Sequence, residues 1–363
     1  MPIKALYIHV PFCKHICAYC DFMRVGYHPK LVADYLKALK LDKVGHDLSR
    51  VDTVYFGGGT PSALSLEELR ELFDLFSTEM KQAKEVTIEV NPETLDEGKV
   101  QLFKECGINR ISLGVQSFKA SELSEMERFH TISDVDTALD SLRSGGLENI
   151  SLDLMYGLPH QTEDSLRYSL SELFKRKVPH FSIYALTLEE HSTWGRQHRQ
   201  ACDSDLEASF YELIQVNAQK AGYQAYEVSN FTQDRPSLHN LHYWNYDDYL
   251  GLGPGSSSKI GMERWDASRN LQHYVSSPKE RQITPLSRDD EAFERIMMGL
   301  RVDDGIDLER FKQSTGFDLP EHYTEALIKH QNLGHLVIQS NHLKTTRQGR
   351  AVLHDVLIDF MLD

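Results

Sequence analysis

Leu6-Tyr-Ile-His-Val10-Pro-Phe-Cys13-Lys-His-Ile-Cys17-Ala-Tyr-Cys20 joins a short apolar strand to a loop that carries three of the chain's five cysteines. Their spacing is C-x3-C-x2-C, and three thiolates are one fewer than an ordinary iron–sulfur or structural zinc site uses. A four-iron cluster held by these three cysteines keeps one iron open for another ligand. The alternative is a zinc knuckle completed by His15, although zinc families usually supply their cysteines in CxxC pairs.

Composition and charge limit the class of protein. The 363 residues include 39 Lys and Arg against 54 Asp and Glu, a formal net charge of −15. This charge argues against a phosphate-binding surface, so no nucleic acid partner is expected. No signal peptide and no apolar run long enough to span a membrane is expected. Few cysteines, mostly clustered, suit a reducing compartment, so we expect a cytoplasmic protein.

Strand-like runs alternate six times with amphipathic helical segments, which predicts right-handed crossovers and a parallel sheet. Six units predict an α/β fold, a partial (β/α)6 barrel short of the usual eight. Ser65, Ser133 and Thr162 are the expected helix caps. The expected helices include Leu66–Met80, Ser133–Arg143 and Thr162–Phe174, and the expected strands are Leu6–Val10, Thr53–Phe56, Val86–Val90, Arg110–Val115, Ile150–Met155 and Phe181–Leu186.

The strands of this expected barrel alternate apolar and polar residues. One face is apolar, while the other carries Glu89, Gln116 and Asp153 in the third, fourth and fifth strands. Side chains alternate with a period of two, so the apolar face can pack on helices while the polar face points inward. A buried carboxylate without a partner costs several kcal/mol. The pattern therefore predicts an interior that holds a polar ligand; the alternative is a polar network that satisfies itself.

The character of the chain changes past Gly222. A strand over Tyr226–Phe231 and a Gly/Ser-rich turn over Gly251–Ser258 are expected, followed by a boundary within Ser276–Leu286. Helices and a small hairpin then predict a mostly helical, winged-helix-like C-terminal domain; a DNA-binding role for it conflicts with the charge. The expected domains are 1–225, 226–280 and 281–363. The C-terminal elements are expected over Glu291–Leu300, Leu308–Ser314, Pro320–His330, Leu336–Ile338 and a last helix ending near Met361.

The cysteine motif resembles that of the radical SAM superfamily. The resemblance implies a 4Fe–4S cluster on Cys13, Cys17 and Cys20, whose open iron binds the amino and carboxylate groups of S-adenosylmethionine (SAM). It also implies an electron donor, because an electron from the cluster cleaves SAM to a 5′-deoxyadenosyl radical. Gly57-Gly-Gly-Thr-Pro61 looks like the segment that holds the SAM ammonium group, with a plain turn as the alternative. The resemblance places SAM contacts at Tyr7, Gly58, Gly59, Thr60, Glu89, Gln116, Arg128 and Asp153.

A finer resemblance covers nearly the whole chain. Three segments resemble motifs of the anaerobic coproporphyrinogen III oxidase-like group. They are Tyr7-Ile-His-Val-Pro-Phe-Cys13, Gly114-Val-Gln-Ser-Phe118 and Asp153-Leu-Met-Tyr-Gly-Leu-Pro159. The oxidase typically has a further cysteine two places after the third, where this chain has Phe22. One departure from the pattern is Met126-Glu127 before Arg128, where a Leu-Gly pair is common.

The segment His239-Asn240-Leu241-His242-Tyr243-Trp244 matches the His-Asn-x-x-Tyr-Trp motif of the group's haem-chaperone branch. This resemblance implies haem binding at His239, Asn240, Tyr243 and Trp244, and transfer of haem to an acceptor protein that the sequence does not identify. Imidazole is a good ligand for haem iron and aromatic rings suit a porphyrin face, although a histidine among aromatics is also common as a structural residue. The alternative function is an oxygen-independent coproporphyrinogen III oxidase that decarboxylates two propionates. Phe22 and the motif favour the chaperone.

Overall fold

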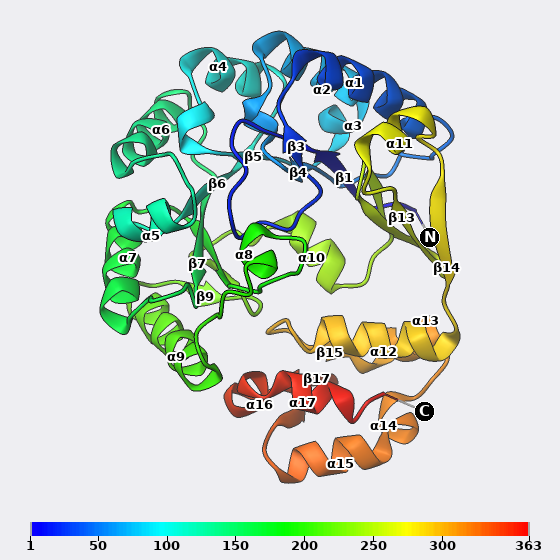
Figure 1. Cartoon of the computed structure of the whole chain (residues 1–363). Helices are drawn as coiled ribbons and strands as arrows, with labels where there is room; N and C mark the ends of the chain where they lie inside the picture. The colour runs from blue at the N-terminus through cyan, green and yellow to red at the C-terminus, as the bar shows by residue number, and fades with distance from the viewer. Residues whose placement is uncertain (1, 362–363) are drawn as a thin grey trace.

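A curved sheet of twelve strands organises the computed structural model, which describes residues 2–361 (Figure 1). Its strand order is β14-β13-β12-β11-β1-β4-β5-β6-β7-β8-β10-β9, and the sheet does not close on itself. The six central strands run parallel, which confirms the predicted partial barrel. They are β1 Ala5–Val10, β4 Thr53–Gly58, β5 Glu85–Val90, β6 Arg110–Gln116, β7 Ile150–Tyr156 and β8 His180–Ala185.

Helices cover the outer face of these strands, as Figure 1 shows. Ser65 and Thr162 cap their helices as predicted, each through a capping box. The predicted helix 66–80 is instead two helices that meet at Phe76, where φ is −116° and ψ is 15°. The cap predicted at Ser133 is wrong, because Thr131 forms a capping box with Asp134 and Ser133 lies inside the helix. The helices are α1 Pro29–Lys43, α2 Leu66–Leu75, α3 Ser77–Gln82, α4 Glu97–Glu105, α5 Ala120–Glu125, α6 Ile132–Ser144, α7 Glu163–Lys175, α8 Thr193–Arg196 and α9 Ser204–Lys220.

Residues 224–285 add strands to both edges of the barrel sheet. The strand predicted over 226–231 forms only at its end, as part of β10 (Asn230–Thr232), which pairs with β8. The predicted turn Gly251–Ser258 is wrong in part, because its first residues belong to β11 (Tyr249–Leu252), which runs parallel to β1. The expected linker 276–286 contains the edge strand β14 (Arg281–Pro285). The other elements are β9 Gln224–Ala225, α10 Leu238–Trp244, β12 Ser257–Ile260, β13 Glu263–Ala267 and α11 Leu271–Ser276.

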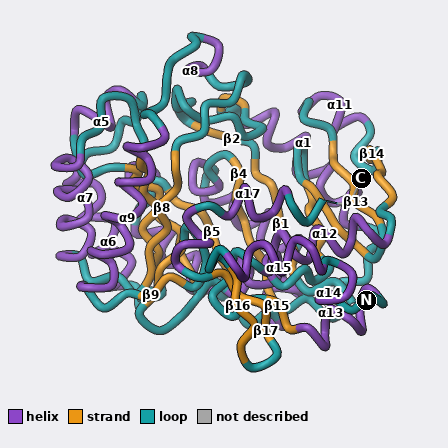
Figure 2. Tube along the Cα trace, turned by 90° about the horizontal axis from the view of Figure 1, so that it is seen from below, coloured by secondary structure: helices purple, strands orange, loops and turns teal. Residues whose placement is uncertain are grey.

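The C-terminal region is mostly helical, as predicted, and has a hydrophobic core of its own around Ile296, Phe311 and Phe360. It lies beneath the barrel in Figure 1 and in front of the strands in Figure 2. Its last helix ends at Ile358 rather than near Met361. No helix within residues 2–361 is long and apolar enough to cross a membrane. The elements are α12 Arg288–Gly299, β15 Ile306–Asp307, α13 Leu308–Thr315, α14 Leu319–His322, α15 Thr324–Asn332, β16 Leu336–Gln339, β17 His342–Thr345, α16 Arg347–Ala351 and α17 Leu353–Ile358.

The inward face of the barrel is not filled by hydrocarbon. Outward side chains such as Ile88 and Leu113 are fully buried under the helices. Near the carboxyl ends of the strands, by contrast, the inward side chains of Glu89, Gln116 and Asp153 keep solvent-exposed surface. The alternation predicted from the sequence is therefore confirmed, and it leaves a polar interior beside the loops that follow β1 and β4.

Candidate functional site

The cysteine loop starts at the carboxyl end of β1 and is tied down at several points. Cys13 ends the short strand β2 (Phe12–Cys13), which pairs in parallel with β3 (Val25–Gly26). Ala18 donates its N–H to the Met126 carbonyl and accepts from the Trp194 N–H of α8. These bonds fix the loop that carries the three cysteines against neighbouring segments.

The three thiols lie in surroundings that suit coordination to a metal cluster. Burial raises the pKa of the Cys13 thiol and raises that of Cys20 to about 11, so these thiols stay protonated unless a cation stabilises the thiolate. The Thr60 hydroxyl lies 3.6 Å from Cys13 Sγ, and Arg128 Nη1 lies 3.7 Å from Cys17 Sγ. Both donors favour thiolate sulfurs. The residues present therefore fit a 4Fe–4S cluster.

His15, the candidate fourth ligand of the zinc alternative, is exposed, and its ring contacts that of Phe129 at an interplanar angle of 39°, with 4.1 Å between ring centroids. Within residues 2–361, no three His, Cys, Asp or Glu side chains are grouped to hold a single metal ion.

The glycine run after β4 packs directly against the start of the cysteine loop. Gly59 and Thr60 donate their N–H groups to the carbonyls of Val10 and Phe12, at 2.9 Å each. A Cβ at Gly59 would lie 2.9 Å from the backbone of Pro11, and Gly58 has a φ of +111°. Larger residues would therefore displace the loop or strain the turn. The glycines are more than a plain turn, because the position of the cysteine loop depends on them.

Glu89 is held at the carboxyl end of β5 by two donors. The Tyr55 hydroxyl donates to Oε1 at 2.9 Å and the Gly58 N–H donates to Oε2 at 3.0 Å. Burial raises the pKa of Glu89 to about 7, and the nearby carboxylate of Asp153 adds to the rise. A cationic ammonium group placed beside Glu89 would stabilise its ionised form.

Arg128 is a half-buried cation whose hydrogen-bond partners are mostly neutral. Its Nη2 donates to the Gly114 carbonyl and to Asn91 Oδ1, while its buried Nε has no partner within residues 2–361. A guanidinium group that has no carboxylate partner and one unpaired N–H is suited to bind the carboxylate of a ligand. The preceding Glu127, which replaces the glycine common in the family, has a φ of +57°. The left-handed backbone explains why glycine is usual there.

Asp153, Gln116 and Tyr7 complete the inward face. The Ser112 and Ser151 hydroxyls donate to Asp153 at 2.5 and 3.0 Å, and burial raises the pKa of this carboxyl. Gln116 has a φ of +66° at an irregularity in the pairing of β6 with β7. The Tyr7 hydroxyl lies 3.1 Å from His9 Nδ1. Protein contacts thus satisfy part of the predicted polar network, while its members still face the interior.

The His-Asn-x-x-Tyr-Trp segment forms α10 at the opposite, amino end of the strands. His239 Nδ1 lies 2.8 Å from the Thr53 hydroxyl at the start of β4, and Glu85 at the start of β5 accepts the His239 N–H at 2.9 Å. His239 is 1% exposed, and burial lowers its pKa to about 3, so its ring is neutral. Asn240, Tyr243 and Trp244 are half-buried. The structure therefore separates the cysteine loop from this motif.

Comparisons with known proteins show the family of this chain. Residues 7–173 match the radical SAM superfamily, and residues 286–352 match the HemN C-terminal domain. The chain is 32% identical over 370 residues to the heme chaperone HemW of Lactococcus lactis, covering 99% of this chain and 98% of that protein. It is likewise 32% identical to HemW of Bacillus subtilis, over 99% of each. The chain belongs to the HemW family.

A solved structure extends the comparison to the fold. The Escherichia coli coproporphyrinogen III oxidase HemN, a radical SAM enzyme, matches with a TM-score of 0.85 at 21% identity, covering 99% of this chain and 90% of that one. The partial barrel and the C-terminal region of this HemW-family chain are thus arranged as in HemN.

Sequence reasoning missed residues that position the site in this HemW-family chain. Tyr55 contacts Glu89 through its hydroxyl and His239 through its ring, with 5.0 Å between the ring centroids. Glu85 binds the first turn of α10, and Asn91 binds both Arg128 and Thr60. The alternation of side chains along β4 could have identified Tyr55, because Tyr55 lies on the same inward face of the strand as Thr53 and Gly57.

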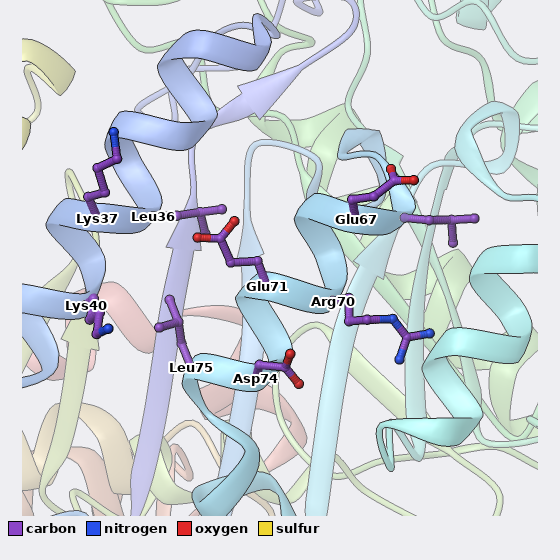
Figure 3. A pocket seen from close by; sticks show the side chains of 9 residues that line it. Leu36, Lys37, Lys40, Glu67, Arg70, Glu71, Asp74 and Leu75 are labelled. Atoms are coloured by element: carbon purple, nitrogen blue, oxygen red, sulfur yellow. The ribbon is translucent and has the colours of Figure 1, made fainter.

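A groove on the outer helical layer carries none of the predicted site residues. It lies between α1 and α2, where Lys37, Lys40, Glu71 and Asp74 mix both signs of charge (Figure 3). Helices cover this side of the sheet, so the groove does not face the barrel interior.

Proposed function

We propose that this chain binds haem on α10 and passes it to an acceptor protein, while its barrel holds a 4Fe–4S cluster and SAM. The observation that carries the proposal is the end-to-end similarity to proteins named heme chaperones, together with the intact motif His239-Asn240-x-x-Tyr243-Trp244. We place the protein in the cytoplasm. We divide it into 1–225, 226–280 and 281–363, with the first residues of the last part, strand β14, paired to β13 of the barrel sheet.

The barrel residues have distinct roles in this proposal. Cys13, Cys17 and Cys20 hold the cluster, which supplies one electron to SAM when an unidentified donor protein reduces it. Arg128 pairs with the SAM carboxylate, and Glu89 accepts from its ammonium group beside Gly58, Gly59 and Thr60. Asp153 and Gln116 bind the ribose hydroxyls of SAM, and Tyr7 lines the SAM site.

The haem proposal is tested by titrating the full-length protein with ferric haemin and following the Soret band. We expect saturable binding of one haem, and loss of haem from the complex when a haem-free acceptor such as apomyoglobin is added. The control is the protein unfolded in guanidinium chloride. A titration without saturation would contradict haem binding.

The second candidate is coproporphyrinogen III oxidase activity, which the fold shared with HemN favours. Phe22 argues against it, because it stands where the oxidase typically has a fourth cysteine. Anaerobic incubation with coproporphyrinogen III, SAM and dithionite decides between the two. We expect no protoporphyrinogen IX above the level of a protein that lacks the three cysteines.

A further inference from the structure

The proposed haem-binding helix α10 carries two histidines in different states. Both ring nitrogens of His239 have protein partners: Nδ1 lies 2.8 Å from the Thr53 hydroxyl and Nε2 lies 2.8 Å from the Tyr243 hydroxyl. The residue is 1% exposed. Iron coordination needs an accessible ring nitrogen with a free lone pair. His239 can offer one only by breaking a hydrogen bond and leaving its buried position.

His242 has the free nitrogen that His239 lacks. Its Nδ1 lies 2.9 Å from Asp247 Oδ2, and its Nε2 has no hydrogen-bond partner within residues 2–361. The side chain is 17% exposed. Asp247 also pairs with Arg310, whose Nη2 lies 3.0 Å from Oδ1. A carboxylate oxygen accepts, so Nδ1 donates this hydrogen bond, and the neutral ring in this tautomer has its lone pair on Nε2.

This arrangement is the one that metal-binding histidines adopt in proteins. A ligating imidazole almost always donates its other ring N–H to a carboxylate, carbonyl or water, which fixes the tautomer and raises the basicity of the ligating nitrogen. Leu238 lies one helical turn before His242 on the same face and is 37% exposed. An apolar side chain beside the nitrogen suits the flat face of a porphyrin.

We propose that Nε2 of His242 binds the haem iron, and that His239 instead holds α10 against the barrel. The inference rests on the proposed haem-binding function. The bond formed is a coordinate bond from the Nε2 lone pair, the Nδ1 proton stays in its hydrogen bond to Asp247, and the oxidation state of the iron does not change.

The test compares haemin titrations of the full-length parent, His242→Ala, His239→Gln and Asp247→Asn, with resonance Raman spectra of the ferrous complexes. His242→Ala should lose the Fe–His stretching band and bind haem more weakly. His239→Gln, whose amide can still hydrogen-bond, should keep the band. Asp247→Asn should keep the band at a lower frequency and bind about tenfold more weakly, because the ligand loses its carboxylate partner.

His273→Ala is the matched control, because His273 is another partly exposed histidine beside a carboxylate, 3.2 Å from Glu280. It should leave both the affinity and the band unchanged. An Fe–His band that survives in His242→Ala overturns the assignment while leaving haem binding by the parent intact. Absence of saturable binding in the parent overturns the proposed function as well, so the two failures are distinguishable.

Discussion

Glu89 is the residue whose ionisation bears most directly on SAM binding. Burial raises its pKa to about 7, well above its ordinary value of 4.5. The ionised carboxylate accepts more strongly from the N–H groups of the SAM amino group, so affinity for SAM should rise with pH through about 7 and level off above it. We expect binding roughly tenfold weaker at pH 6 than at pH 8, since one pH unit below the pKa leaves about a tenth of the carboxyl ionised. Calorimetry on anaerobically reconstituted protein measures this.

Glu89→Gln is the control for this pH dependence. It should bind SAM weakly at every pH, because its neutral amide cannot ionise. The same raised pKa predicts that the protein without SAM loses stability as pH rises from about 4.5 to 7, because the unfolded carboxyl ionises first. A flat pH profile of SAM affinity in the parent would contradict the role given to Glu89.

A site residue could be predicted from the sequence where the pattern that identifies it lies within a single strand or helix. Glu89, Gln116 and Asp153 were identifiable because alternation along a single strand sets which way each side chain points. The partners of His239 were not identifiable, because Thr53 lies 186 residues earlier in the chain. Whether a histidine has a free ring nitrogen depends on such contacts, so the motif alone could not distinguish His239 from His242.

At the scale of the element, α10 is held by a carboxylate that precedes it by about 150 residues. Glu85 is 5% exposed and accepts the N–H groups of Leu238 and His239 at 3.0 and 2.9 Å. Glu85→Gln removes the charge and one acceptor at this helix terminus, which should cost about 1–3 kcal/mol. We expect faster amide hydrogen exchange in α10 and weaker haem binding, measured by exchange mass spectrometry and haemin titration.

Glu79→Gln provides a matched control for this effect. Glu79 is 6% exposed and pairs with Lys43 at 2.8 Å, away from α10. Its substitution should lower stability without changing exchange in α10. Equal exchange in α10 for parent and Glu85→Gln would show that the carboxylate does not hold the helix.

Helices and strands could be predicted where the periodicity of apolar residues and the capping residues indicate the same boundaries. The six barrel strands were found because each apolar face is continuous and each strand is separated from the next by a helix. β11 was not recognised because Gly251 and Gly253 indicate a turn, whereas pairing with β1, more than 240 residues earlier, makes the segment a strand. The misplaced cap of α6 arose because Thr131 and Ser133 are both good caps, and Asp134 decides for Thr131.

At the scale of the whole molecule, the two proposed sites lie at opposite ends of the same strands. The cysteine loop follows the carboxyl ends of β1 and β4, while α10 packs on the amino ends of β4 and β5. Six residues of β4 separate them, about 20 Å at the rise of a β-strand. Tyr55 links the two ends, because it contacts both Glu89 and His239.

This separation predicts that the cluster can be removed without loss of haem binding. Substitution of Cys13, Cys17 and Cys20 by alanine should abolish the brown cluster absorbance and the bound iron, while the haemin titration changes by less than about threefold. The haemin affinity should stay near that of the parent because the α10 contacts with Thr53 and Glu85 are untouched. Iron analysis and Soret titration of the same preparation measure both effects. Parallel loss of haem binding, with far-ultraviolet circular dichroism unchanged, would mean that the cysteine loop and α10 act as one site.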